Sequence, residues 1–343
     1  MECFRTLILA PEKNNFIMMN ILIAIVVLLI IAALVQVVRV GELISEVKKQ
    51  DVNKVTDKDN KVQATLFFLI GGVAYLSLVL WQFKYWGVHI LPPASSVHGL
   101  TVDALMNFTL GLIIFVFFLT QPILVWFVFK YRKNKSRGAF YYPHNNKLEI
   151  IWTIVPTIAL TAVILYGLVV WSKITNADVE GATVVEVYSK QFNWTARYSG
   201  EDKTLGNANF RLVKGKNALG VDMKDANAAD DKITREVHLI VNKPVLLKFR
   251  SQDVIHSAYL PHFRVQMNCV PGMTTQFAFT PNKTTAQMKQ EEGEKFDYIL
   301  LCNKICGVAH YNMQMKFVVE TQEQYDAWLA SQKTLSEKLL TQK

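Results

Sequence analysis

Charged side chains are scarce in this sequence: Asp, Glu, Lys and Arg together make up 19% of its 343 residues, while 51% of the residues are hydrophobic. Soluble domains usually carry about 25% charged residues, and disordered chains contain few apolar ones. The composition therefore excludes a disordered chain and argues against a fully soluble protein. Part of the chain is expected to lie in lipid.

Cysteine is also rare. The four cysteines are too few for a disulfide scaffold, and no Cys-x-x-Cys-His motif occurs, so we expect no haem on this chain. Acidic residues are outnumbered, 28 against 37 Lys and Arg, which gives a net charge of +9. Because the Lys and Arg clusters lie beside apolar runs, we interpret them as membrane-topology signals and expect no nucleic-acid partner.

Four apolar stretches are long enough to cross a membrane, since a bilayer core of about 30 Å needs roughly 20 helical residues at about 1.5 Å each. The first is longer than the core of a secretory signal, and no small-residue cleavage site follows it, so we predict a retained helix. Cys3, which precedes it, is interpreted as a surface thiol. The four stretches are 16–38, 64–86, 104–129 and 150–171. The predicted domains are two extra N-terminal helices (1–90), a helix hairpin (91–172) and an outer domain (173–343).

The loop charges predict the orientation of the chain. Segment 130–148 contains six basic residues and no acid, segment 39–63 contains six basic and five acidic residues, and segment 87–103 contains no Lys or Arg. The positive-inside rule places the first two segments in the cytoplasm. Both termini and the whole outer domain would then be periplasmic, on a multi-pass protein of a bacterial inner membrane.

From residue 182 onward the sequence consists of short β-rich runs separated by polar turns, a pattern typical of a sandwich or barrel. Segment 214–232 is rich in Asn, Asp, Ala and Gly and predicts a long surface loop. Apolar residues at helical spacing in 322–340 predict a closing amphipathic helix. The predicted strands are 183–188, 191–198, 210–213, 236–241, 245–250, 274–279, 296–301 and 315–320.

One segment of the outer domain concentrates metal-binding side chains. LCNKICGVAHYNMQM (301–315) contains Cys302, Cys306, His310 and Met313, and His256 lies upstream at the end of a predicted strand. Two thiolates, two imidazoles and a thioether are soft ligands that suit copper rather than Mg²⁺ or Ca²⁺. A rigid loop between strands would hold them in similar positions in both oxidation states of the metal, as electron transfer requires.

Three other interpretations of this cluster remain open. In an oxidising compartment Cys302 and Cys306 could form a disulfide, which would leave His256, His310 and Met313 without a role. Zinc accepts Cys₂His₂, but a thioether is a poor zinc ligand and the spacing is not that of a zinc finger. A mononuclear blue copper site needs one Cys, two His and an axial Met, which these residues also supply. The second thiol favours a two-copper centre, because both sulfurs can bridge.

These motifs resemble subunit two of haem-copper cytochrome c oxidases, the subunit that carries copper A. Four further blocks occur in the family's order, and the resemblance covers roughly 100–330: NKLEIIWTIVP, QFNWTARY, SQDVIHS and VPGM. The resemblance implies a membrane-anchored all-β protein, with transmembrane helices followed by a cupredoxin-like Greek-key β-barrel and a C-terminal helix. It also implies that electrons from cytochrome c enter at a binuclear copper centre and pass to haem in subunit one. Oxygen reduction and proton translocation would take place in that subunit.

The same resemblance implies roles for individual residues. Cys302 and Cys306 would bridge two copper ions, and His256 and His310 would bind one ion each. Weak ligands would come from Met313 and from the backbone carbonyl of Lys304. Elsewhere, Cys269 is interpreted as a buried free thiol, and neither Cys269 nor His262 is expected to bind the metal.

Glu149 matches the family's acidic residue at the mouth of a proton pathway. An ionisable group at the end of a membrane helix is a functional candidate. The alternative is a helix N-terminal acid that the helix dipole stabilises. The EIIW context of Glu149 favours the pathway role.

Two positions depart from the family pattern. Lys304 stands where the family usually has an acid that helps to bind magnesium, so we expect the magnesium site to be absent or differently built. Phe192 stands where the family has the tryptophan that accepts electrons, and Trp194 lies two residues on. We expect electron acceptance near these aromatics; the alternative is that they pack in the core. Because residues 173–343 are mildly basic, a neutral, acidic or tethered c-type cytochrome would suit as donor better than a strongly basic one.

Other functions fit these residues less well. A quinol oxidase subunit of similar fold would lack the thiols, and a stand-alone tethered cupredoxin would have no need of Glu149. A nitrous-oxide-reductase-like protein would be soluble and carry a large additional domain. The sequence therefore predicts the electron-accepting subunit of a cytochrome c oxidase, with the other oxidase subunits as partners. The extra N-terminal helices are interpreted as a packing surface for another subunit or for a donor complex in a respiratory supercomplex.

Overall fold

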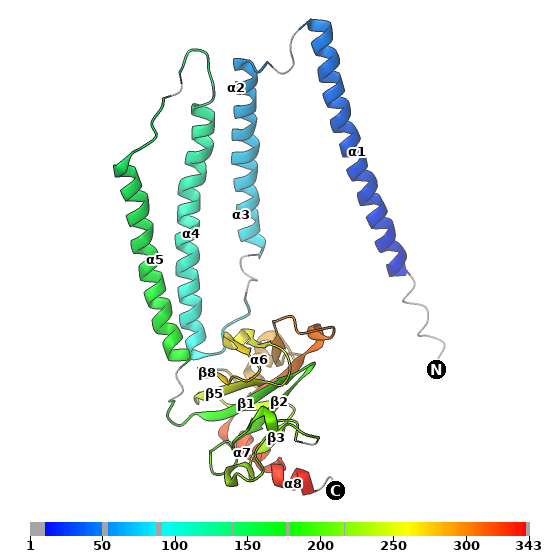
Figure 1. Ribbon diagram of the computed structural model, residues 1–343, viewed down its shortest axis with the longest axis vertical. Coiled ribbons are helices and arrows are strands. Elements are labelled where there is room, and N and C mark those ends of the chain that lie inside the picture. Colours follow the sequence, from blue (N-terminus) through cyan, green and yellow to red (C-terminus); the bar gives the residue numbers. More distant parts are fainter. Residues whose placement is uncertain are drawn as a thin grey trace. The chain divides into compact units, whose positions relative to one another are not determined.

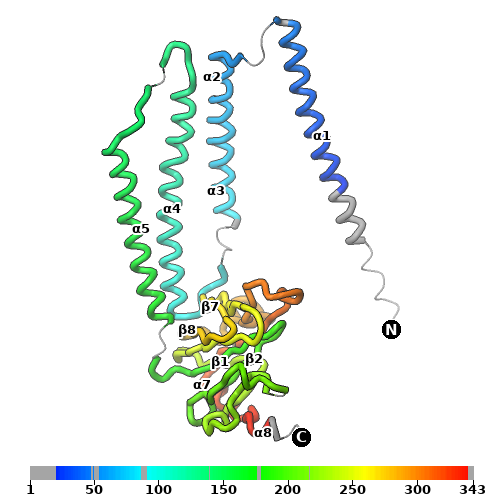
Figure 2. Tube along the Cα trace, viewed as in Figure 1, coloured from blue at the N-terminus to red at the C-terminus, as the bar shows by residue number. Residues whose placement is uncertain are grey.

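The computed structural model describes residues 11–49, 54–86, 91–138, 140–175, 179–215 and 217–340. Cys3 lies outside the described residues. Two compact units make up the chain: residues 1–77 with 121–141, and residues 78–120 with 142–343. Figures 1 and 2 follow the chain by colour from blue at the N-terminus to red at the C-terminus. Within the described ranges, four helices are long and apolar enough to cross a membrane, and they are Ile21–Val47, Asp57–Tyr85, Val97–Lys130 and Asn146–Ile174.

The first unit consists of membrane helices. Helix α1 (Pro11–Lys48) has an apolar window that nothing else in the described chain buries. Helix α2 (Asp57–Leu66) starts at a capping box formed by Thr56 and Asp59 and continues through a π-helical segment, Phe67–Ala74. This second helix packs on the end of α4 (Val97–Lys130): the Phe68 and Phe129 rings are 5.8 Å apart, and Gly72 lies against Val125. A small residue at this contact lets two membrane helices approach closely.

The second unit contains the helices that lead into the outer domain. Helix α3 (Tyr75–Trp86) ends the second apolar segment, and α4 and α5 (Asn146–Ile174) are the next two. Asn145 caps α5 by accepting a hydrogen bond from the Leu148 backbone N–H at 3.1 Å. Pro122 and Pro156 lie inside α4 and α5, a position that membrane helices tolerate when neighbouring groups satisfy the freed carbonyls.

Arg264 joins the outer domain to the start of α4. Its Nε and Nη2 donate to the two carboxylate oxygens of Asp103 at 2.7 and 2.9 Å, and Nη2 also donates to the carbonyl of Pro92 at 2.7 Å. Beside it, the buried Ser96 hydroxyl donates to the carbonyl of Phe263 at 2.8 Å. A bidentate Arg–carboxylate pair fixes orientation as well as distance.

Two five-stranded sheets form the outer domain, in the orders β3-β2-β1-β5-β8 and β4-β10-β9-β6-β7. Most neighbouring strands are antiparallel, but β1 runs parallel to β5 and β10 parallel to β4, so the chain crosses between sheets as in a Greek key. The strands are β1 (Thr183–Lys190), β2 (Asn193–Tyr198), β3 (Lys232–Thr234), β4 (Val237–Ile240), β5 (Val245–Ser251), β6 (His256–Leu260), β7 (Val265–Cys269), β8 (Thr275–Phe279), β9 (Tyr298–Cys302) and β10 (Gln314–Glu320).

A single apolar core lies between the sheets. It takes Val187 and Phe249 from the first sheet and Leu300 and Phe317 from the second, all fully buried. Alternation along the strands produces this core, because side chains two residues apart lie on the same face. Burying four side chains of this size contributes several kcal/mol, at about 1.5–3 kcal/mol each.

Residues 199–231, between β2 and β3, form an insertion that packs on the outer face of the first sheet. Leu219, Val221 and Ala228 of the insertion are buried with Tyr188 of β1 and Leu335 in a small second core. The predicted surface loop 214–232 is therefore only partly a surface loop. Its apolar residues are too widely spaced to give a helical or strand pattern.

A buried group of charges ties this insertion to the sheet. The Arg197 guanidinium donates to Glu186 and Asp231, each at 2.7 Å, and to the carbonyl of Gly206 at 2.8 Å. Arg250 donates to the other oxygen of Glu186 at 2.9 Å. Burial raises the pKa of Asp231 to about 6, although Arg197 and the Gly206 N–H act in the opposite direction. The two arginines and the two carboxylates neutralise one another, which offsets the cost of burying these charges.

Several predicted elements differ from the observed ones. Residues 210–213 were predicted as a strand but contain a 3₁₀ turn, Phe210–Leu212, because Asn209 caps it by accepting from the Arg211 N–H. The closing helix is split into α7 (Gln322–Ser331) and α8 (Leu335–Leu340), since Thr334 and Glu337 form a new helix start. Strands β3, β6 and β7 and helix α6 (Thr285–Glu292) were not predicted.

Candidate metal centre

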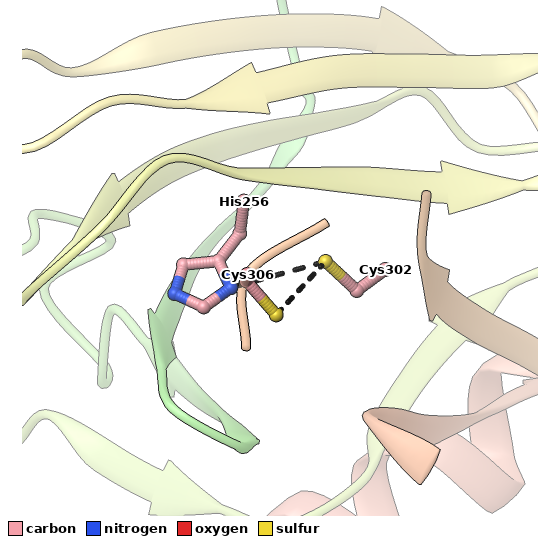
Figure 3. Close-up of side chains that lie close together, drawn as sticks. All are labelled: His256, Cys302 and Cys306. Carbon is pink, nitrogen blue, oxygen red and sulfur yellow. Dashed lines mark hydrogen bonds between the residues drawn. The ribbon is translucent and has the colours of Figure 1, made fainter. Parts of the chain in front are cut away.

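Neighbouring strands of the second sheet bring the predicted ligands together. Cys302 is the last residue of β9, and the loop 303–313 that follows carries Cys306, His310 and Met313. His256 is the first residue of β6, not the end of β5 as the sequence predicted. Because β6 pairs with β9, His256 and Cys302 reach the same end of the sheet. Figure 3 shows His256, Cys302 and Cys306 converging on one point.

The distances define a compact cluster. Cys302 Sγ lies 3.9 Å from Cys306 Sγ and 3.8 Å from His256 Nδ1. Cys306 Sγ lies 3.5 Å from His310 Nδ1 and 3.9 Å from Met313 Sδ. The backbone carbonyl of Lys304 lies 3.3 Å from Cys302 Sγ. The six predicted metal-binding residues therefore meet, with the two thiols at the centre.

These separations fit metal binding. With thiolate–metal bonds of about 2.3 Å and imidazole–metal bonds of about 2.1 Å, two ligands on one ion at tetrahedral angles lie about 3.6–3.8 Å apart. The two sulfurs are far beyond the roughly 2.05 Å of a disulfide bond. Each thiol also has an imidazole of its own, His256 for Cys302 and His310 for Cys306. The soft donor set is one that copper prefers.

Ionisation of the Cys306 thiol depends on a nearby cation. Burial, together with the neighbouring Cys302, raises the pKa of the Cys306 thiol to about 11. A thiol with such a pKa is protonated at neutral pH, whereas metal binding requires the thiolate. The cluster is therefore built so that its second thiol ionises when a positive ion compensates the charge.

Asp253 orients His256. The ring Nε2–H of His256, taken as the donor, lies 2.9 Å from Asp253 Oδ1, which leaves Nδ1 free to face Cys302. Burial would raise the pKa of Asp253, but hydrogen bonds from the Gln191 N–H, His256 and the Val254 N–H hold it below its usual range. A carboxylate behind a metal-binding imidazole fixes its ring and raises its basicity. Asp253 was not predicted as a site residue. The sequence does offer a signal for it, because Asp253 is an acidic residue only three positions before the predicted ligand His256.

Trp194 lies inside the domain, with 2% of its surface exposed. Its indole N–H donates to the carbonyl of Met313 at 3.3 Å, and its ring meets the His256 ring edge-on at 6.1 Å. Trp194 therefore contacts two of the predicted ligand residues, Met313 and His256, from the interior of the domain. Its burial agrees with the alternative that this aromatic packs in the core, and its part in electron acceptance stays a prediction.

Phe192 and Gln191 cover the cluster loop from the turn between β1 and β2. Phe192 is half-buried, and Gln191 donates from its side-chain amide to the carbonyl of Cys306. Both approach Gly307 so closely that a Cβ there would lie 2.7 Å from Phe192 and 2.9 Å from Gln191. Gly307 also has a φ of 143°, a conformation that favours glycine.

The tip of the same loop exposes three apolar side chains. Ile305, Val308 and Tyr311 are 88%, 92% and 82% exposed, and the Lys304 side chain is exposed beside them. Exposed apolar residues gathered on one loop mark a surface that meets another molecule. Sequence reasoning missed them, because they lie between the ligands without a periodic pattern.

Glu149 lies far along α5 from this cluster. It is in the first turn of the helix, where its carboxylate accepts from the Asn145 N–H at 3.3 Å. The helix end Ile174 is 25 residues on, which corresponds to about 38 Å at 1.5 Å per residue. The structure thus gives Glu149 a capping contact and does not bring it to the metal centre.

Comparison with known proteins agrees with this geometry. The family model "Cytochrome C oxidase subunit II, transmembrane domain" matches residues 84–170, and "Cytochrome C oxidase subunit II, periplasmic domain" matches residues 183–322. The chain belongs to the cytochrome c oxidase subunit II family. The two matches cover the helix hairpin and the sheet domain, whereas α1 and α2 precede them.

Relatives of this subunit II chain include the alternative cytochrome c oxidase subunit 2 of Bradyrhizobium diazoefficiens, 35% identical, with 68% of this chain and 81% of the relative covered. Cytochrome c oxidase subunit 2 of Synechocystis is 26% identical over 79% of this chain and 83% of its own length. Among solved structures, the periplasmic domain of cytochrome oxidase subunit II of Bradyrhizobium japonicum is 22% identical, covers 45% of this chain and 94% of its own, and has a TM-score of 0.31.

Membership of the subunit II family confirms the predicted fold class. The observed helices followed by two mixed sheets and C-terminal helices form a membrane-anchored protein with a cupredoxin-like domain. That domain is the periplasmic part of a subunit II chain. The family also implies copper, for which the Cys–His cluster provides soft ligands.

Proposed function

We propose that this chain accepts electrons from a c-type cytochrome at a binuclear copper centre and passes them to haem in oxidase subunit one. There, oxygen would be reduced to water with proton translocation. The observation that carries the proposal is the pair of buried thiols, 3.9 Å apart, each with its own imidazole. The family match supports the placement of this cluster in an oxidase.

The ligand roles follow from position. Cys302 and Cys306 lie at the centre of the cluster and would bridge two coppers, while His256 and His310 would each bind one. Weak ligands would be the thioether of Met313 and the carbonyl of Lys304. When bound, copper would supply one-electron acceptance and release at these ligands.

The surrounding residues hold this arrangement. Asp253 fixes the His256 ring, and Trp194 holds the Met313 backbone. Phe192 and Gln191 cover the loop from one side, through their contacts with Gly307 and with the carbonyl of Cys306. Since Trp194 is buried, we place electron acceptance from the donor at Phe192 and the exposed loop tip.

Two further roles concern the rest of the chain. Glu149 would stand at the mouth of a proton pathway into subunit one, and its location in the first turn of α5 supports this. Lys304 replaces the acid that a magnesium site would use, and its positive charge opposes Mg²⁺, so we expect the magnesium site to be absent or differently built. The basic segment 130–148 supports a bacterial inner-membrane location with that segment in the cytoplasm.

The test is copper content and electron paramagnetic resonance of the full-length chain, purified in detergent and loaded with copper. We expect two coppers per chain and hyperfine splitting from one unpaired electron shared by both nuclei. Cys302→Ser should abolish this signal. Cys269→Ser is the matched control, because Cys269 is also a free, buried thiol but not a member of the cluster.

Other outcomes would contradict the proposal. One copper per chain that survives Cys302→Ser would indicate a mononuclear blue copper site. A chain that binds no copper would be a docking or structural subunit. Loss of the signal in Cys269→Ser as well would mean that the domain, rather than the ligand set, had been disrupted.

A further inference from the structure

A groove of about 850 Å³ opens on the outer domain outside the metal centre. Its walls come from the β1–β2 hairpin, the strand β3, the insertion 199–231 and the helices α7 and α8. The insertion and α8 meet here because Leu335 and Leu219 belong to one buried apolar cluster, and because the Leu335 N–H donates to the carbonyl of Asp231 at 2.6 Å. The groove is thus a built feature of the fold.

The rim of this groove is positively charged. Four basic residues line it, Lys190, Arg235, Lys316 and Lys338, of which Lys316 is paired with Asp297 outside the groove, and Glu236 is the one acid in the lining. Lys190 and Arg235 are exposed and have no ion-pair partner among the described residues. An excess of unpaired cations over a concave surface concentrates negatively charged ligands.

The floor of the groove is apolar. Trp328, Leu219 and Leu335 form part of it, and the exposed Met223 lies at its edge. Trp328 is held rigid by stacking on His238, with 3.9 Å between the ring centroids and 8° between the planes. At interfaces, a few side chains that fill well-packed pockets carry most of the binding energy, so an apolar anchor residue fits this floor.

A polar group in the wall points to a polypeptide occupant. Gln252 lines the groove, and its buried side-chain oxygen has no hydrogen-bond partner in the described part of the chain. This acceptor needs a donor, which a backbone N–H provides and an ionised carboxylate does not. Carboxylates for the rim, one apolar anchor for the floor and N–H groups for Gln252 together describe an acidic peptide segment.

We propose that this groove binds an acidic segment of the electron-donor protein that carries one apolar or aromatic anchor residue. The position favours the donor over other acidic proteins, because Lys190 and Asn193 of the groove flank Gln191 and Phe192, which cover the metal-binding loop. The assignment to the donor rests on the proposed function; the binding of an acidic segment does not.

The first measurement is binding of a fluorescein-labelled acetyl-Glu-Glu-Leu-Trp-Glu-Glu-amide peptide to the full-length chain in detergent, by fluorescence anisotropy. We expect saturable binding that weakens between 50 and 300 mM salt, as the Debye length falls from about 14 to about 6 Å. Lys190→Glu and Arg235→Glu should each weaken binding roughly threefold to tenfold. Lys295→Glu makes the same charge change at an exposed position outside the groove and should leave the affinity within twofold.

The second measurement links the groove to the donor. In the assembled oxidase, the peptide should slow reduction of the enzyme by its own c-type cytochrome and leave reduction by ascorbate with a small mediator unchanged. The Lys190→Glu/Arg235→Glu variant should slow the cytochrome reaction about tenfold at low salt, with an unchanged copper signal. A copper signal in the unsubstituted enzyme that differs from that of a binuclear centre would contradict the proposed function. It would not affect the groove proposal, because peptide binding is measured by anisotropy and does not depend on copper.

Four results would overturn the inference. Equal affinity for the peptide with every Glu replaced by Gln would show that charge does not select the occupant. Full displacement by 10 mM inorganic phosphate would indicate a small-anion site. Self-association of the chain that Lys190→Glu abolishes would identify a second copy as the occupant. Tight peptide binding without any effect on reduction by the cytochrome would exclude the donor.

Discussion

Replacing Gly307 with alanine should open the metal-binding loop. The added Cβ would lie 2.7 Å from the Phe192 ring and 2.9 Å from the Gln191 side chain, at a φ of 143°. The backbone conformation alone costs alanine about 1 kcal/mol, and forcing a methyl group into a packed contact costs about 2 kcal/mol more. A total of about 3 kcal/mol corresponds to a fall of roughly 6–12 °C in the thermal midpoint of a domain of this size.

The assay is thermal unfolding of the full-length chain followed by tryptophan fluorescence, together with the copper resonance spectrum. Gly293→Ala is the matched control, since Gly293 has a φ of 105° but nothing within 4 Å of the added Cβ, and it should cost about 1 kcal/mol. Phe192→Leu in the Gly307→Ala background should restore part of the loss by making room. Equal effects of Gly307→Ala and Gly293→Ala, or no recovery with Phe192→Leu, would refute the steric argument.

Three further outcomes are expected. Trp194→Phe removes the hydrogen bond to the Met313 carbonyl, so it should lower the free energy of unfolding by about 1 kcal/mol. The reduction potential of the copper centre should shift while the copper content stays the same, and an unchanged potential would show that this contact does not position Met313. Asp253→Asn should weaken copper binding about 10- to 100-fold in a chelator competition, whereas Asp297→Asn, at an acid paired with Lys316, should have no effect. Because the pKa of Asp231 is raised from 3.8 to about 6 in the folded chain, the folded state holds the proton more tightly, and stability should fall as the pH rises between these values. This decline should be absent in Asp231→Asn, and identical pH profiles for both chains would contradict it.

The membrane helices and most strands could be predicted from sequence because their signals are local. Apolar length predicts a span, and alternation predicts a strand such as 245–250, observed as Val245–Ser251. β6 was missed because it is buried on both faces, so no alternation is visible in its sequence. β7, in contrast, does alternate between apolar and polar residues, so its signal was present in the sequence and was overlooked. The insertion's small core was missed because Leu219 and Leu335 are 116 positions apart and meet only in the folded chain.

The metal-binding cluster could be predicted because its residues are chemically distinctive and four of them lie within twelve positions. Its supporting contacts could not. Asp253 and Trp194 act through a ring nitrogen and a backbone carbonyl, which depend on how two sheets are packed. The burial of Trp194 also depends on how the sheets pack. Phe192 and Trp194 are two residues apart, so strand alternation treats them alike and does not indicate which of the two rings is covered by the second sheet.

The clamp of Arg264 on Asp103 and Pro92 has a consequence for assembly. Its hydrogen bonds to both carboxylate oxygens leave the outer domain little freedom to swivel about the start of α4. A protein that is already immobilised in its binding orientation loses less rotational entropy when a partner docks. The outer domain, with its thiol cluster, would therefore already have a fixed orientation relative to the start of α4 when the subunit meets its partner in the bilayer. Complex formation would then not have to select one domain orientation from many.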